Sequence, residues 1–234
     1  MKKIFDNYIN NSFDGVKEQS HFKSQQFTTN YKKFFPKDTA NTAVLDIGIG
    51  RGEMLSCMKD WGYKNYNGID ITRSTIDYCK SINLRCEYTE DTVLWLKNKE
   101  NSFDIITLFD VIEHIKKEDV LDFLDAIRFA LKKGGLVILQ TPNMQSMDSN
   151  LHRWGDITHE FGLTESSFKQ ILLESNFRDI NFYGFEWIVE NKIKNKAAKI
   201  LRYIQSKIIY INRKISGNLT PKILNPIFFA VAKK

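Results

Sequence analysis

The sequence lacks a long apolar run, a cysteine framework and a secretory leader. No uninterrupted apolar stretch in its 234 residues approaches the roughly 18 residues needed to cross a bilayer. The three cysteines, Cys57, Cys79 and Cys86, are too few and too irregularly spaced for a disulfide framework or a zinc site. The first residues include two lysines but no apolar segment after them, unlike a signal peptide. We therefore expect a soluble, reduced, cytoplasmic protein.

The composition favours a folded protein with an uneven charge distribution. Hydrophobic residues make up 42% of the chain and aromatic residues 13%, which is enough for a core. The formal net charge is +6, yet residues 190–234 carry eleven basic residues and one acid. The other 189 residues carry 23 basic and 27 acidic residues. The basic charge thus belongs to the C-terminal segment, while the rest of the chain is mildly acidic.

Short apolar runs alternate with helical segments, which is typical of an α/β fold with a parallel sheet and right-handed crossovers. The pattern predicts strands at 43–47, 66–70, 85–88, 103–108, 136–140, 180–187 and 227–231. It predicts helices at 16–35, 53–61, 74–82, 117–132, 165–175 and 191–215, the fifth capped by Thr164. Residues 143–163 interrupt this rhythm. An irregular segment of that length with several titratable groups is more often functional than disordered.

A glycine-rich turn follows the first strand, in Val44-Leu45-Asp46-Ile47-Gly48-Ile49-Gly50-Arg51-Gly52. Glycines let a backbone approach a ligand without interference from Cβ atoms. The spacing is not that of a dinucleotide site, and Asp46 stands two residues before Gly48. These features favour a ligand with a cationic amino-acid end over a pyrophosphate. Asp70, twenty residues past Gly50, is placed to accept hydrogen bonds from two ribose hydroxyls.

Five motifs, VLDIGIGRG, GID, SFDIITLFDVIEHI, LKKGGLVILQTPN and DITHEFGLT, give the chain a family resemblance. The chain resembles class I S-adenosylmethionine (SAM)-dependent methyltransferases, in the branch with ubiquinone-type and bacterial glycan O-methyltransferases. The likeness covers about residues 40–187 and a last strand near 227–232. It implies a Rossmann-like α/β fold with a seven-stranded, mostly parallel sheet, an antiparallel last strand and helices on both faces. It also implies SAM as cofactor and S-adenosylhomocysteine as product.

Residue by residue, the resemblance implies a set of SAM contacts. Gly48, Gly50 and Asp46 would serve the methionine portion, Asp70 the ribose, and Ile71, Asp91 and Thr92 the adenine; Phe109 would offer its carbonyl to the amino group, and His114 would lie beside SAM. Some residues have plainer alternatives. The glycines could form only a tight turn, Asp91 could be only a helix cap, and His114 could orient the loop beneath SAM.

Methyl transfer to a hydroxyl also needs a general base. We expect His159 to be that base with Asp156 as its orienting carboxylate, because residues 156–159 resemble the D-x-T-H stretch of glycan methyltransferases. Alternatively, these residues fix the loop by local hydrogen bonds. No Cys/His cluster suggests a metal site. The expected acceptor is a sugar hydroxyl or glycan precursor, and the alternative acceptor is a quinone-precursor or phenolic hydroxyl. A different class of function is that of a non-catalytic SAM-binding or assembly partner.

Two flanking segments complete the predicted organisation. Residues 1–40 would form a helical cap over residues 41–234, with aromatic side chains facing the pocket, namely Tyr8, Phe13, Phe22, Phe27 and Tyr31. Residues 143–163 would form an acceptor-side loop, and residues 190–216 a basic amphipathic insertion. The apolar positions of the insertion recur at helical spacing, at 193, 197, 200, 204, 208, 211 and 215. Its segment 192–215 could pack on the body, form a homodimer or contact a membrane peripherally, at the inner face; nucleic acid is the least favoured partner.

Overall fold

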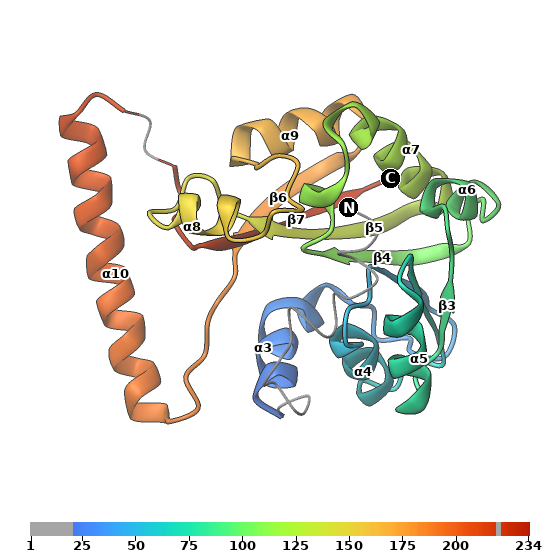
Figure 1. The fold of residues 1–234 in the computed structure, drawn as a ribbon. Helices are drawn as coiled ribbons and strands as arrows, with labels where there is room; N and C mark the ends of the chain where they lie inside the picture. The colour runs from blue at the N-terminus through green and yellow to red at the C-terminus, as the bar shows by residue number, and fades with distance from the viewer. Residues whose placement is uncertain (1–20, 219–220) are drawn as a thin grey trace.

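The computed structural model describes residues 21–218 and 221–234, in which seven strands form one sheet (Figure 1). The strands are β1 (Ala43–Ile47), β2 (Asn65–Asp70), β3 (Cys86–Tyr88), β4 (Phe103–Phe109), β5 (Leu131–Pro142), β6 (Arg178–Gly184) and β7 (Ile227–Lys233). Their order across the sheet is β3-β2-β1-β4-β5-β7-β6. The pairs from β3 to β5 are parallel, and β7 is antiparallel to both of its neighbours. The predicted fold class is confirmed.

Helices cover both faces of the sheet (Figure 1). They are α3 (His21–Tyr31), α4 (Glu53–Asp60), α5 (Arg73–Ser81), α6 (Thr92–Lys97), α7 (Val120–Ala130), α8 (Ser149–Trp154), α9 (Glu165–Glu174) and α10 (Lys192–Ile215), with short 3-10 turns η1 (Lys32–Phe34), η2 (Ile112–His114) and η3 (Lys117–Asp119). One buried cluster joins α6, α7 and α9 to the sheet, and a second joins α3, α4 and α5 to the other face. None of the helices within the described ranges is both long and apolar enough to span a bilayer.

Some boundaries differ from the sequence expectation. The helix predicted over 117–132 ends at Ala130, because Leu131 already pairs with Phe103 in the sheet. The sixth strand begins at Arg178 and ends at Gly184, so Phe185 and Trp187 leave the sheet. Residues 143–163 contain the short helix α8. Thr164 caps α9 as predicted, through a capping box with Ser167.

The parallel strands bring polar residues to one edge of the sheet. β1 is buried along its whole length, and Asp46 near its end lies level with Gly68 of β2 and Thr107 of β4. Asp70 ends β2 and Phe109 ends β4. Because the carboxyl ends of adjacent parallel strands meet at one edge, residues from distant parts of the chain face the same space.

Candidate functional site

A cavity of about 550 Å³ lies at this edge, within the range of small-molecule sites. Most of the predicted cofactor-binding residues line it: Asp46, Gly48, Gly50, Asp70, Ile71, Thr92, Phe109 and His114. Asp91 is not among the lining residues, and its Oδ1 accepts a hydrogen bond from the Leu94 N–H at 2.9 Å as the N-cap of α6. The structure thus gathers all of these residues except Asp91 around one space.

The glycine turn forms one wall of the cavity. Gly48 and Gly50 have φ of +72° and +51°, a region that residues with a Cβ rarely adopt. The Gly48 N–H donates to the Ile69 carbonyl at 2.9 Å, which ties the turn to β2. A Cβ on Gly48 would lie 2.3 Å from Cγ2 of Val111. Gly48 therefore serves both the turn and the close approach of the segment after β4.

Replacing Gly48 with Ala is expected to destabilise the fold by more than the left-handed backbone alone costs, which is about 1–2 kcal/mol. The added methyl must displace Val111, so G48A/V111A should regain part of the loss. Gly134→Ala is the matched control, because Gly134 has φ +77° and nothing within 4 Å of an added Cβ. Urea unfolding of the variants measures the difference. Equal losses in G48A and G134A would contradict the clash.

Asp46 is buried beneath this turn, and its Oδ1 accepts a hydrogen bond from the Thr107 hydroxyl at 2.6 Å. Burial raises the pKa of Asp46 to about 8, because a charged carboxylate loses its hydration there. Burial also raises the pKa of Asp70, against the opposing effect of the Thr72 N–H, which donates to its Oδ1 at 2.8 Å. Two buried carboxyls in one cavity favour a ligand with positive charge.

The stability of the fold should decrease as the pH rises from about 4 to about 8, because folded Asp46 keeps a proton that the unfolded chain has released. The contribution of this one residue is at most about 1.4 kcal/mol per pH unit. Asp46→Asn cannot ionise, so it should show a flatter dependence. Urea unfolding at pH 5 and pH 9 compares the two proteins. Identical slopes would contradict a raised pKa at Asp46.

Helix α3 covers the cavity from another side. Its Lys23, Gln26 and Phe27 line the space, and Lys23 forms an ion pair with Glu53. Tyr31 stacks on Phe109 with ring centroids 4.5 Å apart. Of the aromatic residues expected in the cap, Tyr8, Phe13 and the Phe22 side chain lie outside what the structure describes, whereas Phe27 reaches the cavity.

The predicted catalytic residues lie beside His114. The rings of His114 and His159 have centroids 4.7 Å apart. The Thr158 hydroxyl donates to Asp156 Oδ1 at 2.6 Å and lies 2.8 Å from His114 Nδ1. Because a hydroxyl has one hydrogen, Nδ1–H of His114 is the donor in the second contact. Asp156 thus orients His114 through Thr158, whereas the sequence interpretation placed it against His159.

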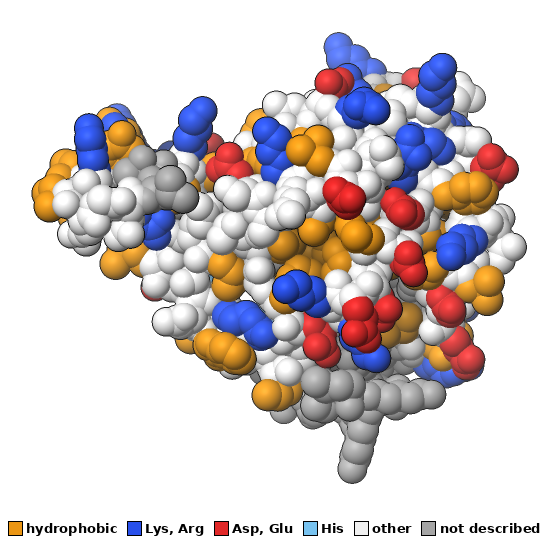
Figure 2. All heavy atoms as spheres, turned by 90° about the horizontal axis from the view of Figure 1, so that it is seen from above, with side chains coloured by type: hydrophobic (Ala, Val, Ile, Leu, Met, Phe, Trp, Pro, Cys, Tyr) orange, Lys and Arg blue, Asp and Glu red, His pale blue; other side chains and the backbone are white. Residues whose placement is uncertain are grey.

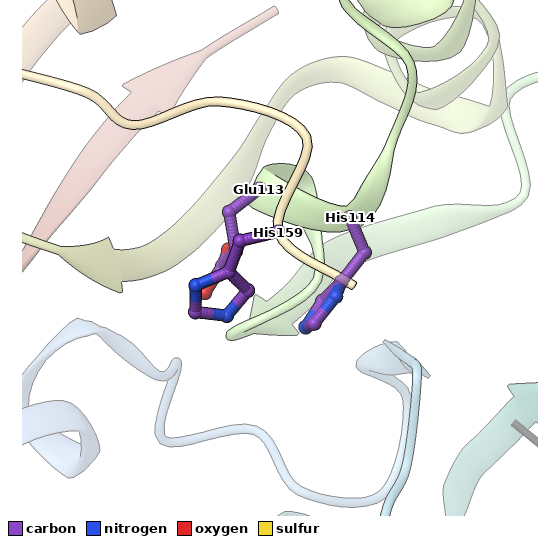
Figure 3. Close-up of side chains that lie close together, drawn as sticks. All are labelled: Glu113, His114 and His159. Atoms are coloured by element: carbon purple, nitrogen blue, oxygen red, sulfur yellow. The ribbon is translucent and has the colours of Figure 1, made fainter. Parts of the chain in front are cut away.

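The sequence analysis did not include Glu113, a residue of η2 that directly precedes His114. Figure 3 shows Glu113, His114 and His159 together, and each offers a ligand atom within 4.8 Å of the others. Glu113 is 1% exposed, and its Oε2 accepts a hydrogen bond from the Thr141 hydroxyl at 3.1 Å. Burial, and then the charge of Asp110, raise the pKa of Glu113 well above its usual value.

Glu113, His114 and His159 form a possible metal-binding group, whereas the sequence analysis expected no metal site. That expectation came from the absence of a Cys/His cluster in the sequence, but the fold brings His159 next to residues 113 and 114. One carboxylate and two imidazoles are a ligand set that divalent metal ions accept. In the sequence, Glu113 stands directly before His114, in the run Asp110-Val111-Ile112-Glu113-His114.

Comparisons with known proteins place these features in a family. The family model described as "Methyltransferase domain" matches residues 20–181, so α10 lies beyond the matched part. A ubiquinone biosynthesis O-methyltransferase of Bartonella tribocorum is 35% identical over 107 residues, 44% of this chain and 42% of that protein. A probable S-adenosylmethionine-dependent methyltransferase of Mycobacterium tuberculosis is 23% identical over 157 residues, 66% and 55% of the two chains.

A solved structure resembles nearly the whole chain. It is a SAM-dependent methyltransferase from Archaeoglobus fulgidus, with a TM-score of 0.70, 23% identity, and coverage of 95% of this chain and 98% of that one. At 23% identity this likeness shows the fold alone. The chain spans about half the length of the curated relatives it matches.

Proposed function

The chain belongs to the methyltransferase-domain family, and we propose that it transfers a methyl group from SAM to a hydroxyl acceptor. The observation that carries this proposal is the gathering of Asp46, Gly48, Asp70 and His114 around one cavity at the carboxyl edge of the sheet. The relatives named as O-methyltransferases support oxygen as the accepting atom.

The residues of the cavity suit SAM. Asp46 and Asp70 are buried carboxyl groups whose charged forms a cationic ligand would stabilise, and the left-handed turn at Gly48 and Gly50 presents backbone without side chains. Asp70 would accept from the ribose hydroxyls, and Ile71, which is 47% exposed within the cavity lining, would pack on the adenine. SAM would supply a methyl group already activated by its sulfonium. The protein's main task is then to align the acceptor.

The acceptor hydroxyl would enter from the side of His114 and His159. An imidazole placed within reach of the hydroxyl can accept its proton. We assign His159 to this activation, with His114 held in place by Thr158 and Asp156. The alternative, that Asp156, Thr158 and His159 only fix the loop, predicts full turnover when His159 is replaced.

For the acceptor we propose a sugar hydroxyl or glycan precursor, from the resemblance of residues 156–159 to glycan methyltransferases. The relatives named for ubiquinone biosynthesis favour a phenolic quinone precursor as the second candidate. A non-catalytic SAM-binding partner is the remaining class, and the gathered histidines count against it.

The test is a calorimetric titration with SAM, followed by turnover assays with sugar, nucleotide-sugar and phenolic acceptors. We expect one SAM site per chain and S-adenosylhomocysteine release with one acceptor class. No SAM binding would overturn the proposal, and SAM binding without turnover across the three classes would favour the non-catalytic reading.

A further inference from the structure

Glu113 has a polar atom that the hydrogen bonds of the protein leave unexplained. Its Oε1 is buried and has no hydrogen-bond partner among the described residues. Leaving a buried carboxylate oxygen unpaired costs free energy. This oxygen belongs to the same side chain that lies beside His114 and His159. A cation held by the three residues would remove that cost.

The surroundings of His114 match those of a metal-bound histidine. A ligating imidazole commonly donates its other N–H to an anchored polar group, which fixes the ring and its tautomer. His114 does so from Nδ1 to Thr158, which is in turn anchored on Asp156. The lone pair of His114 then resides on Nε2. This second observation is independent of the Glu113 oxygen.

We propose that Glu113, His114 and His159 bind a divalent transition-metal ion beside the methyl-transfer cavity. Two imidazoles and one carboxylate favour ions such as Zn²⁺, Co²⁺ or Mn²⁺ over Mg²⁺, which prefers oxygen ligands. Three protein ligands leave positions for an acceptor hydroxyl, whose pKa a bound ion lowers. With His159 holding the ion, the acidified hydroxyl would release its proton to solvent, and its oxygen would take the methyl group as the bond from the sulfonium sulfur breaks. This role of His159 would replace the general-base role given above. This role rests on the proposed function, whereas ion binding does not.

The experiment is a Co²⁺ titration of the chelator-treated protein, followed by visible absorption and calorimetry. The wild type should bind one ion, and His159→Ala and Glu113→Gln should each weaken binding at least tenfold. His152→Ala is the matched control, a histidine of α8 in the same loop, and should bind as the wild type does. SAM titration of the same samples has two uses. SAM binding by a variant shows that the variant is folded, and SAM binding by the wild type tests the proposed function independently of Co²⁺.

Absence of Co²⁺ binding by the wild type, or equal binding by the wild type and His159→Ala, would overturn the metal site. If SAM still binds in that case, the proposed function stands. If His159→Ala weakens Co²⁺ binding while Glu113→Gln fails to fold, the site is still supported, because the His159 variant alone carries the comparison.

A separate observation concerns the orientation of α10. The residues of α10 that are partly buried recur in steps of three or four and form one stripe: Asn195, Ala198, Arg202, Ser206, Ile209 and Arg213. The apolar stripe expected from the sequence is a different one, and it is exposed. Ile193 is 82%, Ile208 62% and Ile215 81% exposed. In the structure the apolar stripe therefore does not pack on the body.

Polar contacts attach α10 to the body. Arg202 donates to the Trp187 carbonyl at 2.7 Å and Arg213 donates to the Gln145 carbonyl at 2.5 Å. Lys199 forms an ion pair with Glu186 at 2.9 Å. Figure 1 shows α10 standing apart from the sheet on its connections, and Figure 2 shows basic and apolar side chains together on this projection. The helix thus directs its apolar stripe away from the body.

The charge of α10 favours a membrane surface over a second copy of the chain as the partner of the apolar stripe. Lys192–Ile215 contains eight basic residues and no acidic one. Pairing of this helix with its copy would bring like charges together, whereas an anionic membrane surface attracts each Lys and Arg side chain. We infer that α10 lies on an anionic lipid surface with its isoleucines inserted among the headgroups. A basic amphipathic helix of low overall hydrophobicity is suited to that position.

The test is co-flotation of the full chain with vesicles of phosphatidylcholine alone or with phosphatidylglycerol, at low salt. The wild type should float with the anionic vesicles, and Ile204→Asp/Ile208→Asp should reduce the bound fraction at least tenfold. Leu94→Asp is the control, an exposed apolar residue on α6, and should float as the wild type does. Circular dichroism checks that each variant is folded.

No flotation of the wild type, or equal flotation of the wild type and the double variant, would overturn the lipid proposal. So would a wild-type dimer in light scattering that the double variant abolishes, because the stripe would then belong to a second copy.

Discussion

Replacing His159 with Gln is expected to lower the turnover of methyl transfer by about 10²–10⁴-fold, with the affinity for SAM unchanged. The ring of His159 lies against that of His114, which lines the cavity, but His159 is not itself among the lining residues. Its loss should therefore affect the acceptor and not the cofactor. Steady-state kinetics and a SAM titration of the variant measure the two effects separately.

His152→Gln is the control for this variant, because it removes an imidazole from the same loop without disturbing the contacts around His114. We expect it to retain turnover within a few-fold of the wild type. Turnover near that of the wild type in His159→Gln, with SAM bound normally, would eliminate His159 from the mechanism. Loss of turnover together with loss of Co²⁺ binding would assign its effect to the ion.

Replacing Asp70 with Ala should weaken SAM binding by about 100-fold. The expected contacts are two hydrogen bonds from ribose hydroxyls to a carboxylate, and hydrogen bonds to charged groups contribute about 1.5–3 kcal/mol each. The lower end for two such bonds is about 3 kcal/mol, which corresponds to slightly more than 100-fold, since about 1.4 kcal/mol is tenfold in affinity. Isothermal calorimetry measures the change.

Asp91→Ala is the matched control for Asp70→Ala, because Asp91 follows the neighbouring strand but caps α6. It should bind SAM within a few-fold of the wild type and lose about 1 kcal/mol of stability. A 100-fold loss of SAM affinity in Asp91→Ala would instead show that the carboxylate leaves its cap to contact the adenine. Equal affinities of Asp70→Ala and the wild type would contradict the ribose role of Asp70.

The parts of the site that could be predicted are those encoded by local patterns. Asp46 lies near the end of β1, Gly48 follows β1 directly, and Asp70 ends β2. Parallel strands place their carboxyl ends at one edge of the sheet. Whether Asp91 caps a helix or faces a ligand is not encoded locally, since both roles fit the end of a strand. Glu113 is recognisable as a site residue only when His159 is known to lie beside it. His159 belongs to a loop whose path depends on tertiary contacts, such as the hydrogen bond that the Glu160 N–H donates to the Glu113 carbonyl at 2.8 Å.

The orientation of α10 shows the same limit. Helical spacing identified an apolar stripe, and burial of that stripe on the body was one of three open uses. Periodicity shows that a stripe exists but not what covers it. The carbonyls of Gln145 and Trp187, which receive Arg213 and Arg202, carry no sequence signature. Main-chain acceptors of this kind are set by the conformation of the chain and not by residue type.

The connection that carries α10 starts and ends at adjoining positions of the sheet. Gly184 of β6 pairs with Phe228 of β7, and the Phe185 N–H donates to the Ile227 carbonyl at 3.0 Å. The pairing of β6 with β7 therefore does not depend on the length of the chain that joins them. The entropy cost of closing such a loop rises only slowly with its length. Insertions and deletions between these positions can alter α10 while the sheet beneath the cavity keeps its register.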